Sequence, residues 1–139
     1  MKKVASSILV SLLTFIAAPA FADSHSRVFQ VYYCEYTEDT AEDDDDADDK
    51  VLALADAWLK AAKKTPGGAN MNLAIRFPIA EGDGVDGDFV WVISAPTFAE
   101  WGAFTDAYDG SEAANVDDEL FADLADCGQS TLWEGIVLE

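Results

Sequence analysis

The sequence predicts an α+β domain built on one four-stranded antiparallel sheet with helices on one of its faces. Three observations support this fold class. Strand and helix patterns follow one another in the order strand, helix, strand, strand, helix, strand. The chain beyond residue 22 has the length of one domain. Its two cysteines fall where two strands of such a sheet lie side by side.

Residues 1–22 have the parts of a cleavable secretory signal peptide. Two lysines precede an apolar stretch at 4–18, and Ala20 and Ala22 place small side chains before the expected cleavage site. The apolar stretch contains hydroxyl residues and is shorter than the roughly 20 residues that span a bilayer, which favours cleavage over a membrane anchor. We therefore expect a mature single domain of residues 23–139, periplasmic or extracellular, with no membrane attachment after cleavage.

The mature chain would be strongly acidic. Without the two leader lysines it has six basic and 27 acidic residues, a net charge of −21. Such a field repels phosphates and anionic lipid surfaces, so we expect no nucleic acid and no membrane as a partner. Cationic ligands, divalent ions and basic proteins are compatible with this charge, and solubility alone is the other explanation for it.

The first strand is predicted at residues 27–36, where aromatic and β-branched residues occupy both faces, as in a central strand covered on each side. An acidic loop at 37–49 follows. A helix is predicted over residues 48–64, because apolar residues recur at helical spacing before Pro66. These apolar residues are Val51, Leu52, Leu54, Ala55, Trp58, Leu59 and Ala62.

The next two strands form a predicted hairpin. Residues 72–80 alternate between apolar and other side chains, which indicates a half-buried strand. Pro78 has no amide proton to donate, so this strand belongs at an edge of the sheet. A glycine-rich and acidic connection at 81–88 leads to an apolar third strand at 89–95.

A second helical region starts at a predicted capping box. In it the Thr97 hydroxyl accepts from the amide of Glu100, and the Glu100 carboxylate reaches back to the amide of Thr97. Residues 109–110 interrupt this region, and Ser111 is expected to cap its continuation. A last strand is predicted at residues 130–138.

This order of elements is that of a ferredoxin-like βαββαβ fold. In that topology the end of the first strand lies beside the start of the last, and Cys34 and Cys127 fall at those two places. Two cysteines in an exported protein indicate one disulfide. A catalytic thiol is the alternative, for which the lone histidine, His25 at the mature N-terminus, is a poorly placed activator.

The pattern resembles the dimeric α/β barrel superfamily, ferredoxin-like domains whose open sheet faces pack in pairs. Residues 97–102 and 133–135 are also similar to stretches in small uncharacterised exported bacterial proteins. The superfamily includes cofactor-free monooxygenases, haem-degrading enzymes, dismutases and stress proteins, so the resemblance does not select a reaction. Neither predicted helix contains the histidine that ligates haem iron in some members, and we expect no cofactor.

Both faces of the predicted central strands are apolar, and the helices can cover only one of them. Monomers rarely expose a large apolar patch, so the second face needs a cover. Closed two-fold pairs are the commonest oligomers. We therefore expect a homodimer formed through the open sheet face.

Aromatic side chains are the candidates for a ligand pocket. In this superfamily the pocket lies between the helices and the sheet, where these residues are able to line it or simply fill it. The pocket candidates are Tyr33, Trp58, Trp91, Trp101 and Trp133.

No catalytic or metal-ligating set is predicted. The chain has no histidine suitably placed for a nucleophilic triad. Residues 83–88 combine carboxylates with glycines, yet their spacing differs from that of an EF-hand loop. The acidic run at 43–49 is expected to attract ions without forming a specific site.

These observations predict an exported, acidic, non-catalytic domain that dimerises and binds a small apolar or cationic ligand. One alternative is a cofactor-independent monooxygenase-like enzyme that uses Tyr and Trp residues in the same pocket. Another is an exported calcium-binding protein.

Overall fold

The computed structural model describes residues 26–38, 40, 46–79 and 87–136. Within these ranges the strands and helices follow the predicted order, with the second helical region divided into two helices. They are β1 (Ser26–Tyr36), α2 (Ala47–Ala62), β2 (Asn72–Arg76), β3 (Phe89–Ala95), α3 (Phe98–Tyr108), α4 (Glu112–Asp123) and β4 (Ala125–Ile136).

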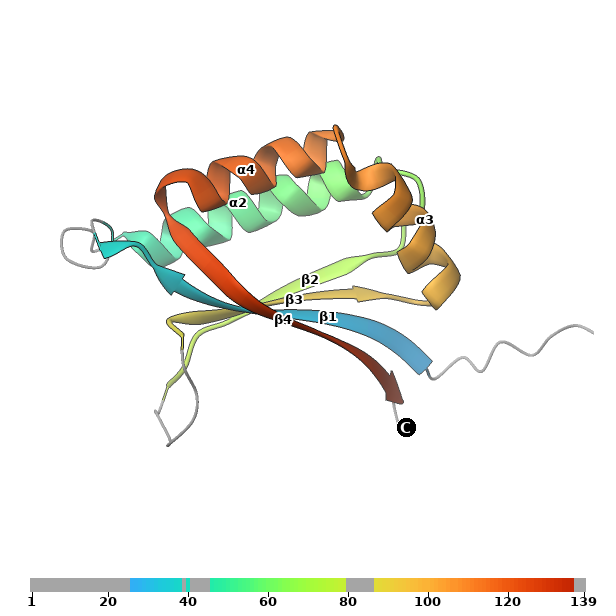
Figure 1. Ribbon diagram of the computed structural model, residues 1–139, viewed down its shortest axis with the longest axis horizontal. Coiled ribbons are helices and arrows are strands. Elements are labelled where there is room, and N and C mark those ends of the chain that lie inside the picture. Colours follow the sequence, from blue (N-terminus) through green and yellow to red (C-terminus); the bar gives the residue numbers. More distant parts are fainter. Residues whose placement is uncertain (1–25, 39, 41–45, 80–86, 137–139) are drawn as a thin grey trace, which may run out of the picture.

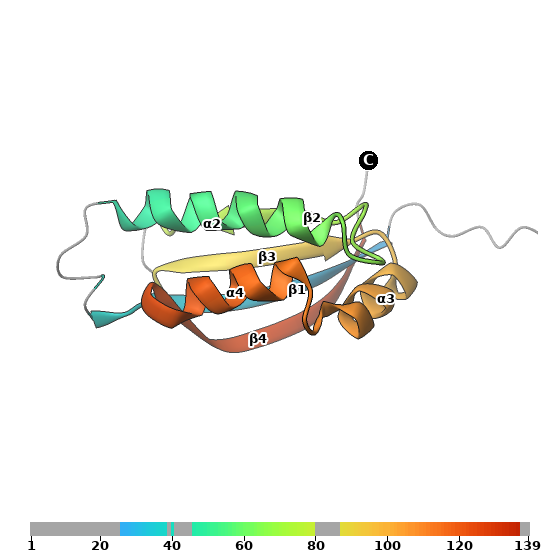
Figure 2. The same ribbon diagram turned by 90° about the horizontal axis from the view of Figure 1, so that it is seen from above.

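The four strands form one antiparallel sheet in the order β2-β3-β1-β4. Helices α2 and α4 lie side by side over one face of this sheet, and α3 lies near its end (Figures 1 and 2). The predicted ferredoxin-like α+β fold is therefore confirmed. β1 is central and β2 is an edge strand, as the residues of these two segments predicted.

The core lies between the helices and the sheet. Val28 and Cys34 of β1 are buried toward the helices, where they join Val51 and Trp58 of α2. Successive side chains of a strand point to opposite faces. Phe29, Val31 and Tyr33 therefore point to the other face of the sheet, which no helix of the described ranges covers (Figure 1).

The last strand begins five residues earlier than predicted. Residues 125–129 pair with the end of β1 through a register shift between Tyr33 and Glu35. Gly128 and the polar residues around it give no apolar alternation, so the sequence pattern shows only the later part of the strand. Cys127 thus lies inside β4, beside Cys34.

Two smaller predictions were wrong. β2 ends at Arg76 instead of residue 80, because Pro78 cannot continue the ladder. Leu52 is 46% exposed although it was assigned to the apolar side of its helix. Neighbouring residues of a helix point about 100° apart, so Val51 occupies the buried stripe and Leu52 falls outside it.

Helix α3 is capped as predicted by Thr97, whose Oγ1 accepts from the amide of Glu100 at 3.1 Å. The carboxylate of Glu100 forms contacts other than the predicted one to the Thr97 amide. It accepts from the Thr97 hydroxyl at 3.1 Å and from Nδ2 of Asn70 at 2.9 Å. The predicted break follows at Asp109 and Gly110, and Ser111 caps α4 by accepting from the amide of Ala114 at 3.1 Å.

The predicted signal peptide at 1–22, His25 and most of the two acidic stretches lie outside the described residues. Among the helices of the described ranges, none is long and apolar enough to cross a membrane.

Candidate functional site

A cavity of about 290 Å³ opens between α3, one residue each of α2 and α4, and the helix-facing side of β1 and β3. Six aromatic side chains account for most of its lining, together with one isoleucine, one threonine and three aspartates. The lining residues are Tyr32, Trp58, Trp91, Ile93, Trp101, Phe104, Thr105, Asp106, Tyr108, Asp109 and Asp117.

The floor of the cavity is made of three buried rings. Trp58, Trp91 and Phe104 are 1%, 4% and 3% exposed. Trp58 meets each of the other two edge to face, with ring centroids 5.7 Å from Trp91 and 5.9 Å from Phe104. This arrangement is the favoured one for aromatic pairs, and it holds the rings in fixed positions.

The wall carries half-buried aromatic side chains with polar ends. Trp101 packs on Phe104 with centroids 6.3 Å apart, and Tyr108 packs on Phe104 at 5.4 Å. The indole nitrogen of Trp58 donates to the Tyr108 hydroxyl at 3.2 Å. The hydroxyl of Thr105 donates to the carbonyl of Trp101 at 2.9 Å, within its own helix.

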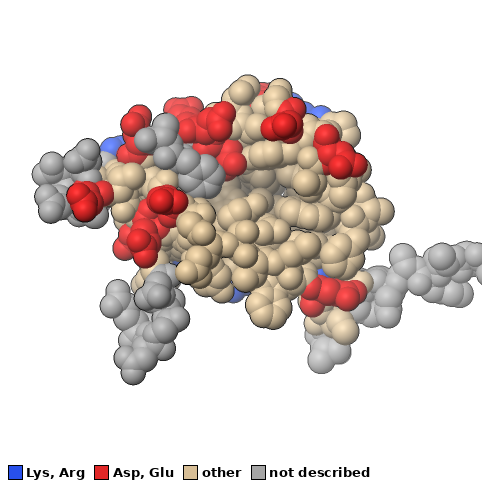
Figure 3. Space-filling view, in the orientation of Figure 1, with Lys and Arg blue, Asp and Glu red and all other residues tan. Residues whose placement is uncertain are grey.

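The acidic residues lie on one side of the cavity. Asp106 and Asp109 are exposed, whereas Asp117 of α4 is half-buried. Burial raises the pKa of Asp117, a hydrogen bond from Tyr108 partly offsets this, and the charge of Asp118 raises the pKa further. Figure 3 shows how acidic side chains gather over the helical side of the molecule.

The two tyrosine hydroxyls of the cavity are held in their protonated form. Burial raises the pKa of Tyr108, and the nearby Asp117 carboxylate raises it further. Burial and the charge of Asp117 also raise the pKa of Tyr32. Both hydroxyls therefore stay neutral at the pH values at which proteins function.

The turn after α2 fixes α3 over the sheet. Gly67 has φ +80°, and a Cβ atom there would meet the Glu100 carbonyl and the Phe104 amide. The backbone of the turn thus packs directly on that of α3. With the Asn70 to Glu100 hydrogen bond, this contact positions the helix that carries Trp101, Phe104 and Tyr108.

Solved structures similar to this chain have the same kind of fold. A dimeric ferredoxin-like protein of unknown function from Thermobifida fusca is 12% identical, with a TM-score of 0.50 over 83% of this chain and 93% of its own. A DABB family protein with a ferredoxin-like fold from Mesorhizobium loti is 13% identical, with a TM-score of 0.49 over 83% of this chain and 99% of its own. At this level of identity, the similarity confirms the ferredoxin-like fold.

A longer chain, provisionally described as a chlorite dismutase, is 18% identical with a TM-score of 0.46 over 81% of this chain. The present chain spans 44% of that protein's length. No family model and no curated protein matches the sequence. The similarity to known proteins therefore lies in the ferredoxin-like fold.

Three of the five pocket candidates lie together. Trp58, Trp91 and Trp101 all line the cavity. Tyr33 and Trp133 lie on the opposite face of the sheet, because they are paired with residues of the open face. Trp133 is 57% exposed there.

Several lining residues were not among the candidates. Tyr32 shares the helix-facing side of β1 with Val28 and Cys34, and strict alternation along the strand distinguishes it from Tyr33. Tyr108 lies on the same helical stripe as Trp101 and Phe104, as their spacing in the sequence indicates. No local sequence signal identifies Asp117, because the packing of α4 on α2 determines which side of α4 meets the cavity.

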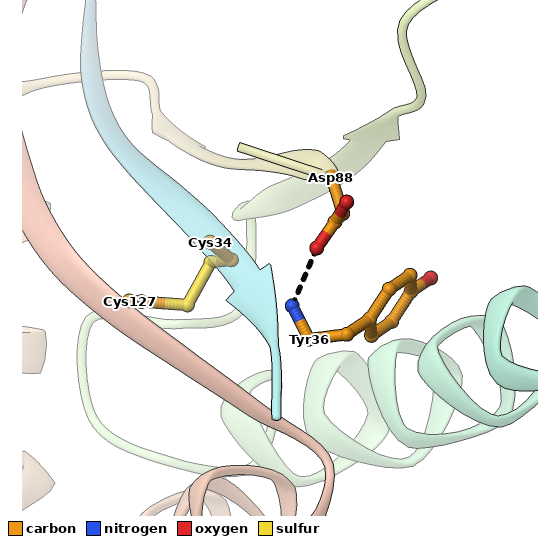
Figure 4. The surroundings of a disulfide bond; sticks show 4 residues. All are labelled: Cys34, Tyr36, Asp88 and Cys127. Carbon is orange, nitrogen blue, oxygen red and sulfur yellow. Dashed lines mark hydrogen bonds between the residues drawn. A yellow bond between two sulfur atoms is a disulfide. The ribbon is translucent and has the colours of Figure 1, made fainter. Parts of the chain in front are cut away.

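Cys34 and Cys127 form the disulfide expected from the sequence, linking β1 to β4 (Figure 4). Next to it, the amide of Tyr36 donates to Asp88 Oδ2 at 2.6 Å, and the amide of Asp88 donates to the Cys34 carbonyl at 2.8 Å. Neither sulfur belongs to the cavity lining. In the structure the cysteines therefore join two strands.

Of the two stretches considered for calcium, residues 43–45 and 83–86 lie outside the described ranges. Within the described ranges, no three His, Cys, Asp or Glu side chains are grouped as metal ligands.

Proposed function

We propose that this domain is an exported, non-catalytic homodimer that binds a small apolar or cationic molecule in the aromatic cavity. The cavity itself is the main support. Its volume of about 290 Å³ is close to the lower end of the range for small-molecule sites. Like such sites, it has an apolar aromatic lining with few polar groups at defined places.

The polar groups of the cavity favour binding over catalysis. A tyrosine that removes a proton must ionise, and the raised pKa values of Tyr32 and Tyr108 oppose this. The Thr105 hydroxyl donates to a carbonyl of its own helix. A monooxygenase-like reaction would therefore depend on Asp117 as its base. Substitution of Asp117 thus tests the alternative that the domain is a monooxygenase-like enzyme.

The open face of the sheet supports the proposed dimer. Phe29, Val31 and Tyr33 of β1 lie beside Val90 and Val92 of β3 on this face. Trp133 of β4 pairs with Phe29 and extends the apolar surface to the strand edge. A patch of this kind is typically covered by a partner.

The described charged residues of the open face lie toward its edges, away from the apolar centre. By strand alternation, Arg27 and Arg76 lie on this face, together with Glu35 and its cross-strand partner Asp126 at one end. Two copies meeting here would place few like charges in contact, despite the net charge expected for each mature chain. The similar ferredoxin-like protein from Thermobifida fusca is itself described as dimeric.

A disulfide between β1 and β4 is consistent with the proposed export, since such bonds persist in oxidising compartments. Expression of the full chain in a bacterium, followed by intact mass measurement of the periplasmic and medium fractions, tests this. We expect a product that begins at Asp23. Recovery of only the uncleaved chain from the membrane would contradict export as a cleaved protein.

Ligand binding is tested by mass spectrometry of small molecules that co-purify with the mature protein and by a fluorescence screen of small aromatic and amine compounds. Two matched variants locate the site. Trp101→Ala removes a ring from the cavity, whereas Trp133→Ala removes one from the opposite face. We expect only the first to weaken binding.

Equal loss of binding in both variants would mean that the ligand does not bind specifically in the aromatic cavity. Turnover of an aromatic compound by the wild type, abolished in Asp117→Asn, would instead support the oxygenase-like alternative.

A further inference from the structure

We infer that the ligand of the aromatic cavity is a small organic monocation, a protonated or quaternary amine that carries an apolar substituent. This inference rests on the proposed function, because it names the chemical class that the proposed site selects. It follows from how the rings and the carboxylates are arranged around one space.

The rings supply a surface that attracts cations. Trp58, Phe104 and Tyr108 follow one another with centroids 5.9 and 5.4 Å apart. Trp91 packs on Trp58 in the floor, and Trp101 packs on Phe104 in the wall. A cation within about 6 Å of a ring centroid is attracted by the negative face of the ring, most strongly for Trp and in desolvated sites. Because the floor rings are buried, a cation here would lose part of its water shell and interact more strongly with them.

Three carboxylates make the electrostatic potential of the cavity negative. Asp106 lies on α3, Asp109 follows that helix, and Asp117 faces the same space from α4. Among the described lining residues there is no lysine, arginine or histidine to balance them. An anionic ligand would meet three like charges, whereas an amine would meet three opposite ones.

Asp117 is the carboxylate best placed to select a cation. It is half-buried, and it interacts with the hydroxyl of Tyr108, which in turn accepts from Trp58. Burial and the charge of Asp118 both disfavour its ionised form, as its raised pKa reflects. A bound cation would offset this unfavourable charge, and a neutral ligand of the same shape would not.

Three ligands of similar shape and different charge test the inference. Benzylamine is a cation at pH 7, benzyl alcohol is neutral and benzoate is an anion. Calorimetry or tryptophan fluorescence on the mature protein gives the dissociation constant of each. We expect benzylamine to bind about tenfold or more tightly than benzyl alcohol, which corresponds to 1.4 kcal/mol, and benzoate to bind least.

Two variants separate a local effect from the overall charge. Asp117→Asn removes the cavity carboxylate, and Asp118→Asn removes the neighbouring exposed one, with the same change in net charge. We expect the preference for benzylamine to fall several-fold in the first variant and to persist in the second. Calcium at millimolar concentration should not displace benzylamine from the wild type.

The outcomes distinguish the two proposals. Equal binding of benzyl alcohol and benzylamine, or tighter binding of benzoate, would overturn the cationic inference while leaving a ligand cavity in place. If Asp118→Asn also lost the preference for benzylamine, that preference would arise from the net negative charge of the protein. This result would overturn the role of the cavity carboxylate. No binding of any probe, with none found in the wider screen, would overturn the proposed function itself.

Discussion

The indole nitrogen of Trp58 donates a hydrogen bond of 3.2 Å to the hydroxyl of Tyr108, which joins α2 to α3 across the floor of the cavity. The two residues are 50 positions apart in the sequence, and each also packs on Phe104. Trp58 is almost completely buried, so its N–H group has little access to water. This bond therefore couples the shape of the cavity to the packing of two helices.

Replacement of Tyr108 by Phe is expected to lower the free energy of unfolding by about 1–3 kcal/mol, because it leaves the buried N–H group of Trp58 without its acceptor. Urea titration followed by circular dichroism measures the change. Tyr33→Phe is the matched control, since within the described residues the Tyr33 hydroxyl makes no hydrogen bond and the ring lies on the other sheet face. Equal stability of the two variants would contradict this role of Tyr108.

The raised pKa of Asp117 implies that the free energy of unfolding depends on pH. Because the folded state binds the proton of this carboxyl more tightly than the unfolded state does, its ionisation lowers stability as pH rises through the folded pKa. Asp117→Asn removes that cost. Relative to the wild type, its unfolding free energy should be higher at pH 7, and this gain should disappear below about pH 4, where the carboxyl is protonated in both states.

Asp118→Asn is the control for this pH profile, because it removes an equal charge from an exposed position on the same helix. Thermal melts of both variants and the wild type from about pH 3 to pH 8 provide the comparison. A pH-dependent gain of the same size in Asp118→Asn would trace the effect to net charge instead of the burial of Asp117.

Two glycines of the α3 region should respond to alanine in opposite ways. At Gly67 the positive φ and the backbone of α3 leave no room for a Cβ atom, so Gly67→Ala should destabilise the fold by more than about 1 kcal/mol. At Gly102, inside α3, a Cβ atom would meet nothing within 4 Å. Gly102→Ala should stabilise by roughly 0.5–1 kcal/mol through helix propensity. Chemical denaturation measures both, and a neutral Gly67→Ala would refute the close approach.

Most of the fold was predictable because its signals are local. The apolar stripe of α2, the Thr97 cap and the break before Ser111 each depend on residues within one or two helical turns. The start of β4 was missed because its first residues are specified by pairing with the end of β1, across more than 80 positions of sequence. Such pairing leaves no apolar alternation in the segment itself.

The candidate site was predictable only in part, for a related reason. The three tryptophans of the cavity lie on apolar faces that periodicity identifies. Both faces of β1 are apolar, so composition alone does not tell which face meets the helices, and it does not distinguish Tyr32 from Tyr33 as a lining residue. Asp117 meets the cavity through the packing of α4 on α2, which is a property of the assembled fold.

The disulfide predicts a chemical difference between oxidised and reduced protein. The bond joins residues 93 positions apart, and loop closure of this length corresponds to roughly 4–5 kcal/mol at most. Reduction, or the pair of changes Cys34→Ser and Cys127→Ser, should lower the melting temperature and leave the cavity residues unchanged. Intact mass should rise by two protons on reduction, and two alkylatable thiols in the exported protein would show that the bond does not form.

The proposed dimer is tested by placing a charge at the centre of the open face. Val31 lies there between Val92 and Thr131, so Val31→Glu would bury a carboxylate in each half of the interface. Leu52→Glu is the control, because Leu52 is an exposed apolar residue on α2, at the helical side of the domain. Light scattering at micromolar concentration in moderate salt should report twice the mature mass for the wild type and Leu52→Glu, and a monomer for Val31→Glu.

Salt dependence adds a second readout to the same experiment. Two mature chains of net charge −21 repel one another, and this repulsion is screened over about 8–10 Å at 0.10–0.15 M salt. Because the open face itself has an apolar centre and few charges, association should tighten as salt rises and then level off. A folded wild-type monomer across this range, with Val31→Glu unchanged in mass, would mean that a segment of the chain itself covers the sheet.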